Sequence, residues 1–284
     1  MPTTIIDGIA TRYEVVGSGP PLLMYAPGGF NAVVESWSTL GVYAKTRMID
    51  HLPEQFTCIL FDRRECGQSG GRVEALTWQH FVTQGKGLLD HLGIKRAHIM
   101  GGCMGCPPVA AFAVAHPDTV LSLVLYWPVG GVKYRLSSHQ RFADHLDFVV
   151  SAGLDGVVAL VKKDGKPFGA DPRGGPWASV IKHDSAFAAS YAALEPERYK
   201  RICNAMCGAL FDRDTAPGAE PGQLMRLDMP ALVVPGHDAS HATSAARYLE
   251  ECLPRADYWD VAVEQQTEDN VPARVVDFLS RTKA

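Results

Sequence analysis

The chain has 284 residues, of which 46% are hydrophobic and 20% are charged, enough for one large globular domain or two of ordinary size. Its 27 basic and 31 acidic residues give a formal net charge of -4 without a long run of like charge, which favours neither a nucleic-acid-binding protein nor one that adheres to an anionic membrane. The sequence contains neither a long apolar stretch nor a basic leader, so we expect a cytoplasmic protein.

The first hundred residues alternate short apolar strands with a helix. Residues 3–16 predict two strands that meet at Asp7-Gly8, a favoured hairpin turn, and residues 22–25 and 58–61 predict two buried strands. A helix follows, with Thr77 as its N-cap and apolar residues at a spacing of 3.6 as far as Gly93. This part of the chain therefore predicts helices that pack on a sheet.

Residues 96–112 predict a short strand, a glycine-rich corner and a helix. Gly101 and Gly105 stand two residues on either side of Cys103, and Pro107 and Pro108 fit only the first turn of a helix. Small residues at these positions let the backbone fold back tightly, so that the side chain between them stands clear of the strand. We therefore expect Cys103 to be presented on a strained strand-to-helix turn.

The rest of the chain predicts a helical insertion within an α/β fold. A strand over residues 120–126 is followed by helical periodicity without a convincing strand; strand 231–234, helix 241–252, strand 258–261 and a last helix from residue 270 then restore the alternation. This order predicts an α/β fold with a mostly parallel sheet and an inserted helical cap. We expect a core of residues 1–131 and 223–284 and a cap of residues 132–222.

Two motifs connect the chain with a known family. The corner around Cys103 matches the nucleophile elbow G-x-S-x-G with cysteine in place of serine, and residues 62–70 match the loop D-x-R-G-x-G-x-S with Glu65 and Cys66 in its middle. On these residues the chain resembles the α/β-hydrolase fold family. A cysteine nucleophile is similar to that of dienelactone hydrolases, whereas the large cap resembles the epoxide-hydrolase and C–C-hydrolase branch.

The resemblance implies a nucleophile and an oxyanion hole. Cys103 would be the nucleophile, and the N-terminus of the helix that follows favours its thiolate. The glycine turn that ends in Gly29 and Phe30 would supply one backbone N–H group, from either residue, and Met104 would supply the other. Many relatives carry a histidine in this turn and this chain does not, but backbone donors do not depend on that side chain.

The resemblance makes Asp238 the acid of the triad but leaves the base open, because no histidine follows His241 in the chain. His241, three residues after Asp238, is one candidate. Glu264 is another, since it stands in the loop where the family has its catalytic histidine. The remaining alternatives are no base at all or a histidine of the cap, namely His139, His145 or His183. His237 should point away from Asp238.

Three other roles compete for the cysteines. Cys103 could be a buried packing residue, or it could form a redox or metal-binding C-x-x-C pair with Cys106, with Cys203 and Cys207 as further ligands. We favour none of these and expect neither a metal nor a cofactor. An odd number of seven scattered cysteines indicates reduced thiols, and Cys106 is expected to pack tightly.

These observations predict a hydrolase of a small ester, lactone or thioester that forms an acyl-enzyme on Cys103. The alternative is a hydrolase-fold lyase, or a ligand-binding or receptor protein without hydrolytic turnover, because the usual catalytic histidine is absent. We expect a small-molecule substrate as partner and leave a homodimer open; no nucleic acid or membrane partner is expected.

Overall fold

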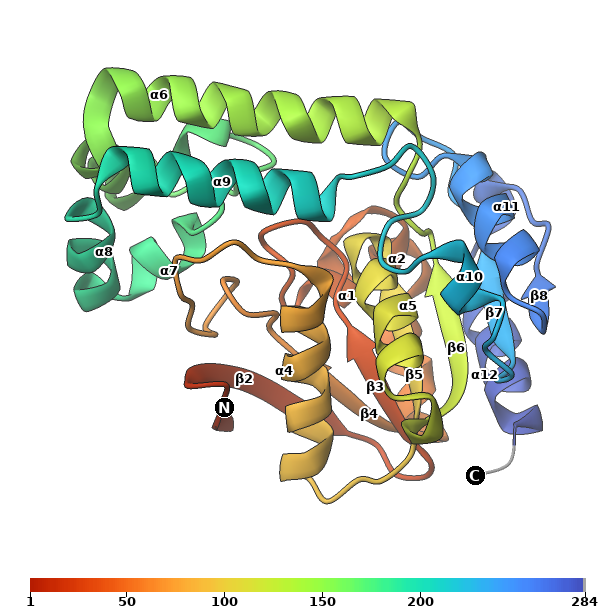
Figure 1. Cartoon of the computed structure of the whole chain (residues 1–284). Helices are drawn as coiled ribbons and strands as arrows, with labels where there is room; N and C mark the ends of the chain where they lie inside the picture. The colour runs from red at the N-terminus through yellow and green to blue at the C-terminus, as the bar shows by residue number, and fades with distance from the viewer. Residues whose placement is uncertain (283–284) are drawn as a thin grey trace.

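A single eight-stranded sheet organises the computed structural model, which describes residues 1–282. Its strand order is β1-β2-β4-β3-β5-β6-β7-β8 (Figure 1). In this order, the neighbouring strands from β4 to β8 run parallel to one another. Strands β1 and β2 lie at one edge of the sheet and pair antiparallel. The α/β fold with a mostly parallel sheet is thus confirmed. The strands are β1 (Thr3–Ile6), β2 (Ile9–Val16), β3 (Pro21–Tyr25), β4 (Thr57–Phe61), β5 (Ala97–Gly102), β6 (Val120–Tyr126), β7 (Ala231–Val234) and β8 (Ala256–Tyr258).

The helices fall into those that cover the sheet and those inserted between β6 and β7. The covering α-helices are α1 (Ser36–Thr39), α2 (Gly41–Thr46), α3 (Met48–His51), α4 (Trp78–His91), α5 (Cys106–Ala115), α11 (Thr243–Cys252) and α12 (Val271–Arg281). The inserted α-helices are α6 (Val132–Asp164), α7 (Ala178–His183), α8 (Ser185–Ala192), α9 (Pro196–Leu210) and α10 (Pro221–Leu224). Short 3-10 turns are η1 (Leu52–Glu54), η2 (Cys103–Gly105), η3 (Pro117–Thr119), η4 (Pro172–Gly174) and η5 (Val263–Gln265).

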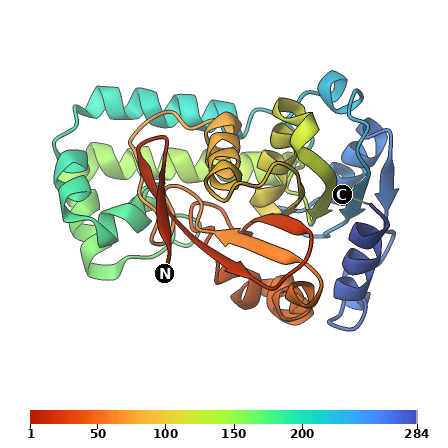
Figure 2. The same ribbon diagram turned by 90° about the horizontal axis from the view of Figure 1, so that it is seen from below.

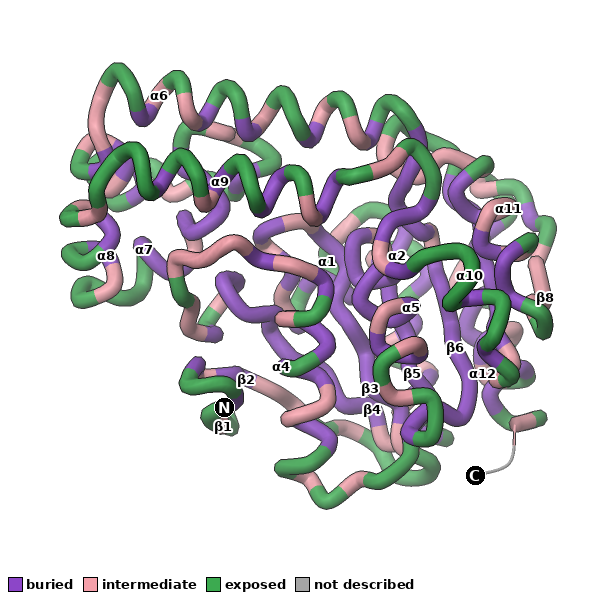
Figure 3. The backbone as a smooth tube through the Cα atoms, viewed as in Figure 1, coloured by how far each residue is buried: buried purple, intermediate pink, exposed green. Residues whose placement is uncertain are grey.

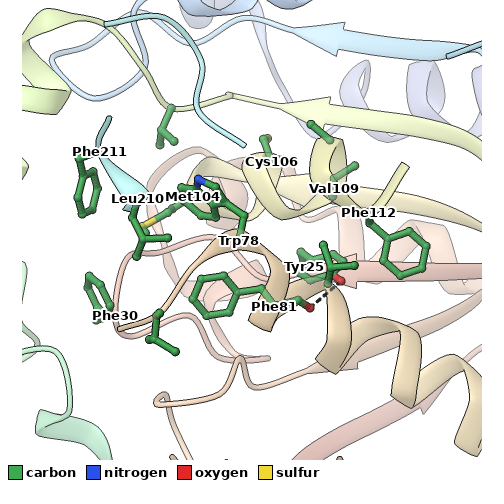
Figure 4. Packing of buried hydrophobic residues seen from close by; sticks show 14 of the residues in the cluster. Tyr25, Phe30, Trp78, Phe81, Met104, Cys106, Val109, Phe112, Leu210 and Phe211 are labelled. Atoms are coloured by element: carbon green, nitrogen blue, oxygen red, sulfur yellow. Dashed lines mark hydrogen bonds between the residues drawn. The ribbon is translucent and has the colours of Figure 1, made fainter. Parts of the chain in front are cut away.

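The sheet is covered by helices on both faces. Successive strand residues point to opposite faces, so Leu23 and Tyr25 pack in one core, with α4, α5 and α11, and Leu22 and Met24 in the other, with α1–α3 and α12 (Figure 2). Strands covered in this way are apolar throughout, and β6 is buried at every position (Figure 3). In the first core the phenol of Tyr25 donates a hydrogen bond to the backbone carbonyl of Phe81 at 3.0 Å (Figure 4).

The inserted helices, residues 132–224, lie across the end of the sheet at which the parallel strands finish (Figure 1). We call this segment the helical insertion. The long helix α6 bends at Gly153, whose φ of 72° is not helical, and α6 and α9 pack side by side. In the described chain this segment carries no strand, as predicted; its division from the core as a separate domain stays a prediction.

Two local boundaries were predicted wrongly, and three short helices were missed. Helix α11 begins at Thr243 rather than at residue 241, so His241 lies in the loop before it. Strand β8 covers Ala256–Tyr258 instead of residues 258–261. Helices α1–α3 were not predicted, because segments of four to six residues are too short to display a helical period. None of the helices in residues 1–282 is long and apolar enough to cross a bilayer.

Candidate active site

Cys103 lies on a strained turn at the end of β5. Its φ is 53°, in the left-handed region that few residues other than glycine adopt. A Cβ at Gly101 would lie 2.4 Å from the carbonyl oxygen of Gly105, and a Cβ at Gly105 would lie 2.3 Å from that of Tyr25. Only glycine fits at both positions, so the elbow predicted from the sequence is confirmed as a backbone geometry.

His241 and Asp238 form a hydrogen-bonded pair in the loop after β7. His241 Nδ1 lies 2.8 and 2.9 Å from the two carboxylate oxygens of Asp238, which also accepts the backbone N–H groups of Ser240 and His241 at 2.8 and 2.9 Å. A carboxylate only accepts hydrogen bonds, so Nδ1 carries the proton. The other ring nitrogen, Nε2, is buried and makes no hydrogen bond of ordinary geometry within residues 1–282. It is therefore free to exchange a proton with a reacting group.

The charges of Cys103 and His241 are coupled. Burial raises the pKa of the Cys103 thiol, but His241 and backbone hydrogen bonds from Gly28 and Met104 outweigh burial, so that this pKa lies below its ordinary value. Burial likewise lowers the pKa of His241, yet Cys103 and Asp238 together raise it to about 9. Hydrogen bonding to His241 holds the pKa of Asp238 below its usual range despite burial. Each of the two groups therefore favours the charged form of the other.

The other six cysteines have a different environment. All seven are free thiols, and Cys103 alone is not fully buried. Burial raises the pKa of Cys58 to about 12 and that of Cys66 to about 11. The Cys106 sulfur lies 3.1 Å from the carbonyl oxygen of Gly101, which confirms the predicted packing role. Within residues 1–282 no three His, Cys, Asp or Glu side chains are gathered in a metal-binding arrangement.

Two backbone segments supply candidate oxyanion donors. Met104, which was predicted, and Gly28, which was not, are the two backbone segments that lower the pKa of the Cys103 thiol. The buried guanidinium of Arg63 donates to the carbonyl oxygens of Gly29 and of Met104, the second at 3.1 Å. Because N–H and C=O point in opposite directions across a trans peptide, the N–H of Phe30 is directed away from Arg63. It makes no backbone hydrogen bond in the described chain.

A pocket of about 190 Å³ separates the elbow from the helical insertion, and both Cys103 and His241 line it. Its walls also include Gly29 and Met104. Five aromatic side chains make up its apolar part: Phe30, Tyr134, Phe142, Phe168 and Phe211. Several of these rings meet edge to face, at centroid distances between 5.2 and 6.0 Å. The remaining polar lining comes from Asn31, Ser138, Arg141 and Ser240.

The other candidate bases lie outside this pocket. Glu264 is exposed on η5, and its backbone carbonyl accepts the Lys45 ammonium at 3.2 Å. His237 is exposed and bonds Thr243 at 3.1 Å, in agreement with the expectation that it turns away from Asp238. The histidines of the helical insertion do not line the pocket either: His139 bonds a backbone carbonyl, His145 is buried against Tyr199 and His183 is exposed.

Gln266 lies in the same loop as Glu264, one of the candidate bases. It is fully buried, and its side-chain oxygen accepts hydrogen bonds from Tyr126 Oη at 3.1 Å and Trp127 Nε1 at 2.7 Å. Its amide donates to the carbonyl oxygen of Pro235 at 2.9 Å. The ring of Trp127 packs against that of His241, with centroids 5.3 Å apart. Sequence reasoning missed Gln266, because nothing in a lone glutamine indicates that it will be buried.

The D-x-R-G-x-G-x-S loop connects the site to the rest of the sheet. The buried Asp62 carboxylate accepts the backbone N–H groups of Val34 and Gln68 at 2.9 and 2.8 Å and an Arg12 guanidinium N–H at 3.1 Å. Glu65 stands where the family has glycine, with a φ of 65°, and burial raises its pKa to about 7 although Arg64 opposes this shift. The loop thus supports the backbone segment that holds Gly29 and Val34 and does not line the pocket.

Comparison with known proteins establishes the family. The profile of the alpha/beta hydrolase fold matches residues 21–166, half of the chain, and the chain therefore belongs to that family. Over 125 residues it is 30% identical to the dihydrolipoyllysine-residue acetyltransferase component of an acetoin cleaving system from Cupriavidus necator. The aligned residues make up 44% of this chain and 31% of that relative. Over 40 residues, 14% of either chain, it is 55% identical to 2-hydroxy-6-oxononadienedioate/2-hydroxy-6-oxononatrienedioate hydrolase 2 from Pseudomonas putida. The chain thus matches less than a third of the length of each of these relatives.

Solved structures share the whole fold at low sequence identity. The enol-lactonase from Burkholderia xenovorans LB400 superposes with a TM-score of 0.61 at 20% identity and covers 98% of this chain and 100% of its own. A thermophilic esterase from Thermogutta terrifontis gives a TM-score of 0.65 at 18% identity, covering 100% of both chains. These likenesses establish the fold, with the helical insertion included in the aligned length.

Proposed function

We propose that the protein hydrolyses a small ester, lactone or thioester through an acyl-enzyme on Cys103. The observation that carries this proposal is the arrangement at the elbow: a thiol with a lowered pKa that faces a pocket beside an Asp-bound imidazole. The membership of the hydrolase family and the enol-lactonase and esterase among the similar structures support it. The helical insertion would serve as a cap that encloses the substrate.

In the first half of the reaction the Cys103 thiolate attacks the carbonyl carbon. A C–S bond forms and the carbonyl electron pair moves to oxygen, where the backbone N–H groups of Met104 and of Phe30, Gly29 or Gly28 would stabilise the oxyanion. Collapse of this intermediate breaks the bond to the leaving group. His241 Nε2 donates its proton to that group, and Asp238 holds the ring through Nδ1.

In the second half water releases the acyl group. Acylation removes the negative charge of the thiolate that raises the pKa of His241, so the imidazole can remain neutral and accept a proton from water. The resulting hydroxide adds to the thioester carbonyl, the C–S bond breaks and the thiolate is restored with the carboxylic acid as product. His241 therefore acts first as an acid and then as a base.

The rival function is ligand binding without turnover, and the replacement of the usual histidine loop by the buried Gln266 favours it. Rapid mixing with 4-nitrophenyl acetate separates the two. Hydrolysis predicts a burst of nitrophenol followed by steady turnover, both abolished in Cys103→Ala. A binding protein would release no nitrophenol above the rate of that variant.

A further inference from the structure

Two hydroxyl groups in the wall of the pocket have no partner. Tyr134 and Ser138 are 5% and 2% exposed, and neither hydroxyl makes a hydrogen bond to another group within residues 1–282. Nearly all buried polar side chains in native proteins are hydrogen-bonded, and a buried hydroxyl without a partner is unfavourable. Because both residues line the pocket, a bound molecule can supply the missing acceptor.

Both residues belong to one face of α6, which also carries Arg141. The intervals of four and three residues between Tyr134, Ser138 and Arg141 place the three side chains on the same side of the helix. All three line the pocket together with Cys103. Burial raises the pKa of the Tyr134 phenol; Cys103 raises it further and Arg141 lowers it, as expected for a phenol close to both groups.

The charge of Arg141 is not balanced by the protein. Arg135, on the same helix, forms an ion pair with Asp214 at 3.4 Å, whereas Arg141 forms no ion pair within residues 1–282. The described pocket lining includes no Asp or Glu side chain. A guanidinium carries its charge at every physiological pH and matches the geometry of a carboxylate. The wall formed by α6 therefore favours an anion.

Aromatic rings form much of the rest of the pocket wall. Phe142, one residue beyond Arg141, packs edge to face against Phe168 and Phe30 at centroid distances of 5.2 and 6.0 Å. These rings can surround a short hydrocarbon segment between a carbonyl at Cys103 and an anionic end group at α6. A carboxylate can accept hydrogen bonds from two hydroxyl groups and a guanidinium at the same time.

We propose that Tyr134, Ser138 and Arg141 form a subsite for a carboxylate that the substrate carries in addition to its reactive carbonyl. The substrate class is then an ester, thioester or lactone with a free carboxylate separated from the reactive carbonyl by a short hydrocarbon segment. This assignment rests on the proposed function, since it deepens the description of the same site.

Two esters of equal chain length test the subsite. One is mono-4-nitrophenyl adipate, with a free carboxylate, and the other is its neutral methyl ester. The wild-type enzyme should show a kcat/KM at least tenfold higher for the acid. In Arg141→Gln the ratio of the two kcat/KM values should fall by about 10- to 100-fold, the loss expected for a charge-assisted hydrogen bond. Arg141→Lys, which keeps the charge, should recover part of it, and Tyr134→Phe and Ser138→Ala should each give a smaller decrease.

Arg135→Gln is the matched control, because Arg135 lies on the same helix, is half exposed and does not line the pocket. It removes the same charge, and the ratio should not change. Equal wild-type kcat/KM values for the two esters, or an equal fall of the ratio in Arg135→Gln and Arg141→Gln, would overturn the subsite while leaving the hydrolase proposal intact.

If neither ester is hydrolysed, the proposed function is rejected. A binding measurement then tests the subsite by itself. Calorimetric titration of the wild-type protein with adipate should then still give a dissociation constant that rises at least tenfold in Arg141→Gln and is unchanged in Arg135→Gln. Undetectable adipate binding by the wild type, or binding that Arg141→Gln leaves unchanged, would overturn the subsite as well.

Discussion

The side-chain oxygen of Gln266 accepts a hydrogen bond from the indole N–H of Trp127 at 2.7 Å. Trp127 adopts a φ of 56°, and its ring packs against that of His241. Gln266 therefore holds a side chain that contacts the imidazole. The loop in which the resembled family has its catalytic histidine thus contributes Gln266, which contacts His241 only through the ring of Trp127. The imidazole itself comes from the loop after β7.

Gln266→Leu should lower both stability and turnover. It leaves the buried Tyr126 hydroxyl and the half-buried Trp127 indole N–H without an acceptor, and the loss for the buried group alone costs about 1–3 kcal/mol of unfolding free energy. We also expect kcat to fall more than tenfold with a smaller change in KM, because the imidazole loses its support. Urea denaturation and steady-state kinetics measure the two effects. Gln265→Ala, next to it and exposed, should change the unfolding free energy by less than about 0.5 kcal/mol.

Cys103 should react with iodoacetamide before any other thiol at neutral pH. It is the one cysteine of the seven that is not fully buried, and its pKa lies below the ordinary value, whereas burial raises the pKa of thiols such as Cys58 and Cys203 to about 12. Peptide mapping at short reaction times gives the order of labelling. Earlier labelling of Cys66 or Cys252 would contradict the assignment.

His241→Ala and Asp238→Asn should each lower kcat/KM by about 100-fold or more, the usual effect of losing a general acid–base group. The double variant should be little worse than either alone, because the two residues act as one hydrogen-bonded unit. Glu264→Gln should be almost silent, since Glu264 is exposed and outside the pocket. A large loss in Glu264→Gln together with full activity in His241→Ala would transfer the role of the base to Glu264.

The dependence of kcat/KM on pH should be bell-shaped. Activity rises as Cys103 deprotonates, at a pH below the ordinary thiol pKa, and falls near pH 9 as the imidazolium of His241 loses the proton that the leaving group needs. Asp238→Asn should move the descending limb to lower pH, because the Asp238 carboxylate helps to raise the pKa of His241. An unchanged descending limb in this variant would mean that the limb reports another group.

The sequence predicted the parts of the site that are encoded locally. Gly101, Gly105 and the two prolines lie within a few residues of Cys103 and dictate the turn by sterics alone, so the elbow could be predicted. The mostly parallel sheet also followed from the alternation of strands and helices and from the family resemblance, whereas the order of the strands comes from the structure. The pairing of Asp238 with His241 could only be proposed as one of several alternatives, because it depends on how a loop closes.

The remaining features depend on tertiary packing. The 3-10 turn η5 (Val263–Gln265) leaves Glu264 exposed and is followed by the buried Gln266, and a difference of two residues leaves no signal in composition or periodicity. Helix α6 was predicted from its apolar residues, but the position of Ser138 and Arg141 over the elbow follows from how the helical insertion docks on the core. Gly28 was missed because the neighbouring Gly29 and Phe30 fit the same turn.

The most direct test of a covalent mechanism is the mass of the protein during turnover. Acid quenching a few seconds after mixing with excess 4-nitrophenyl acetate, followed by intact-mass and peptide analysis, should show a single acetyl group on Cys103. The same treatment of Cys103→Ala should leave the mass unchanged. Steady hydrolysis by the wild type with no adduct at Cys103, or with the acetyl group on another residue, would contradict the account.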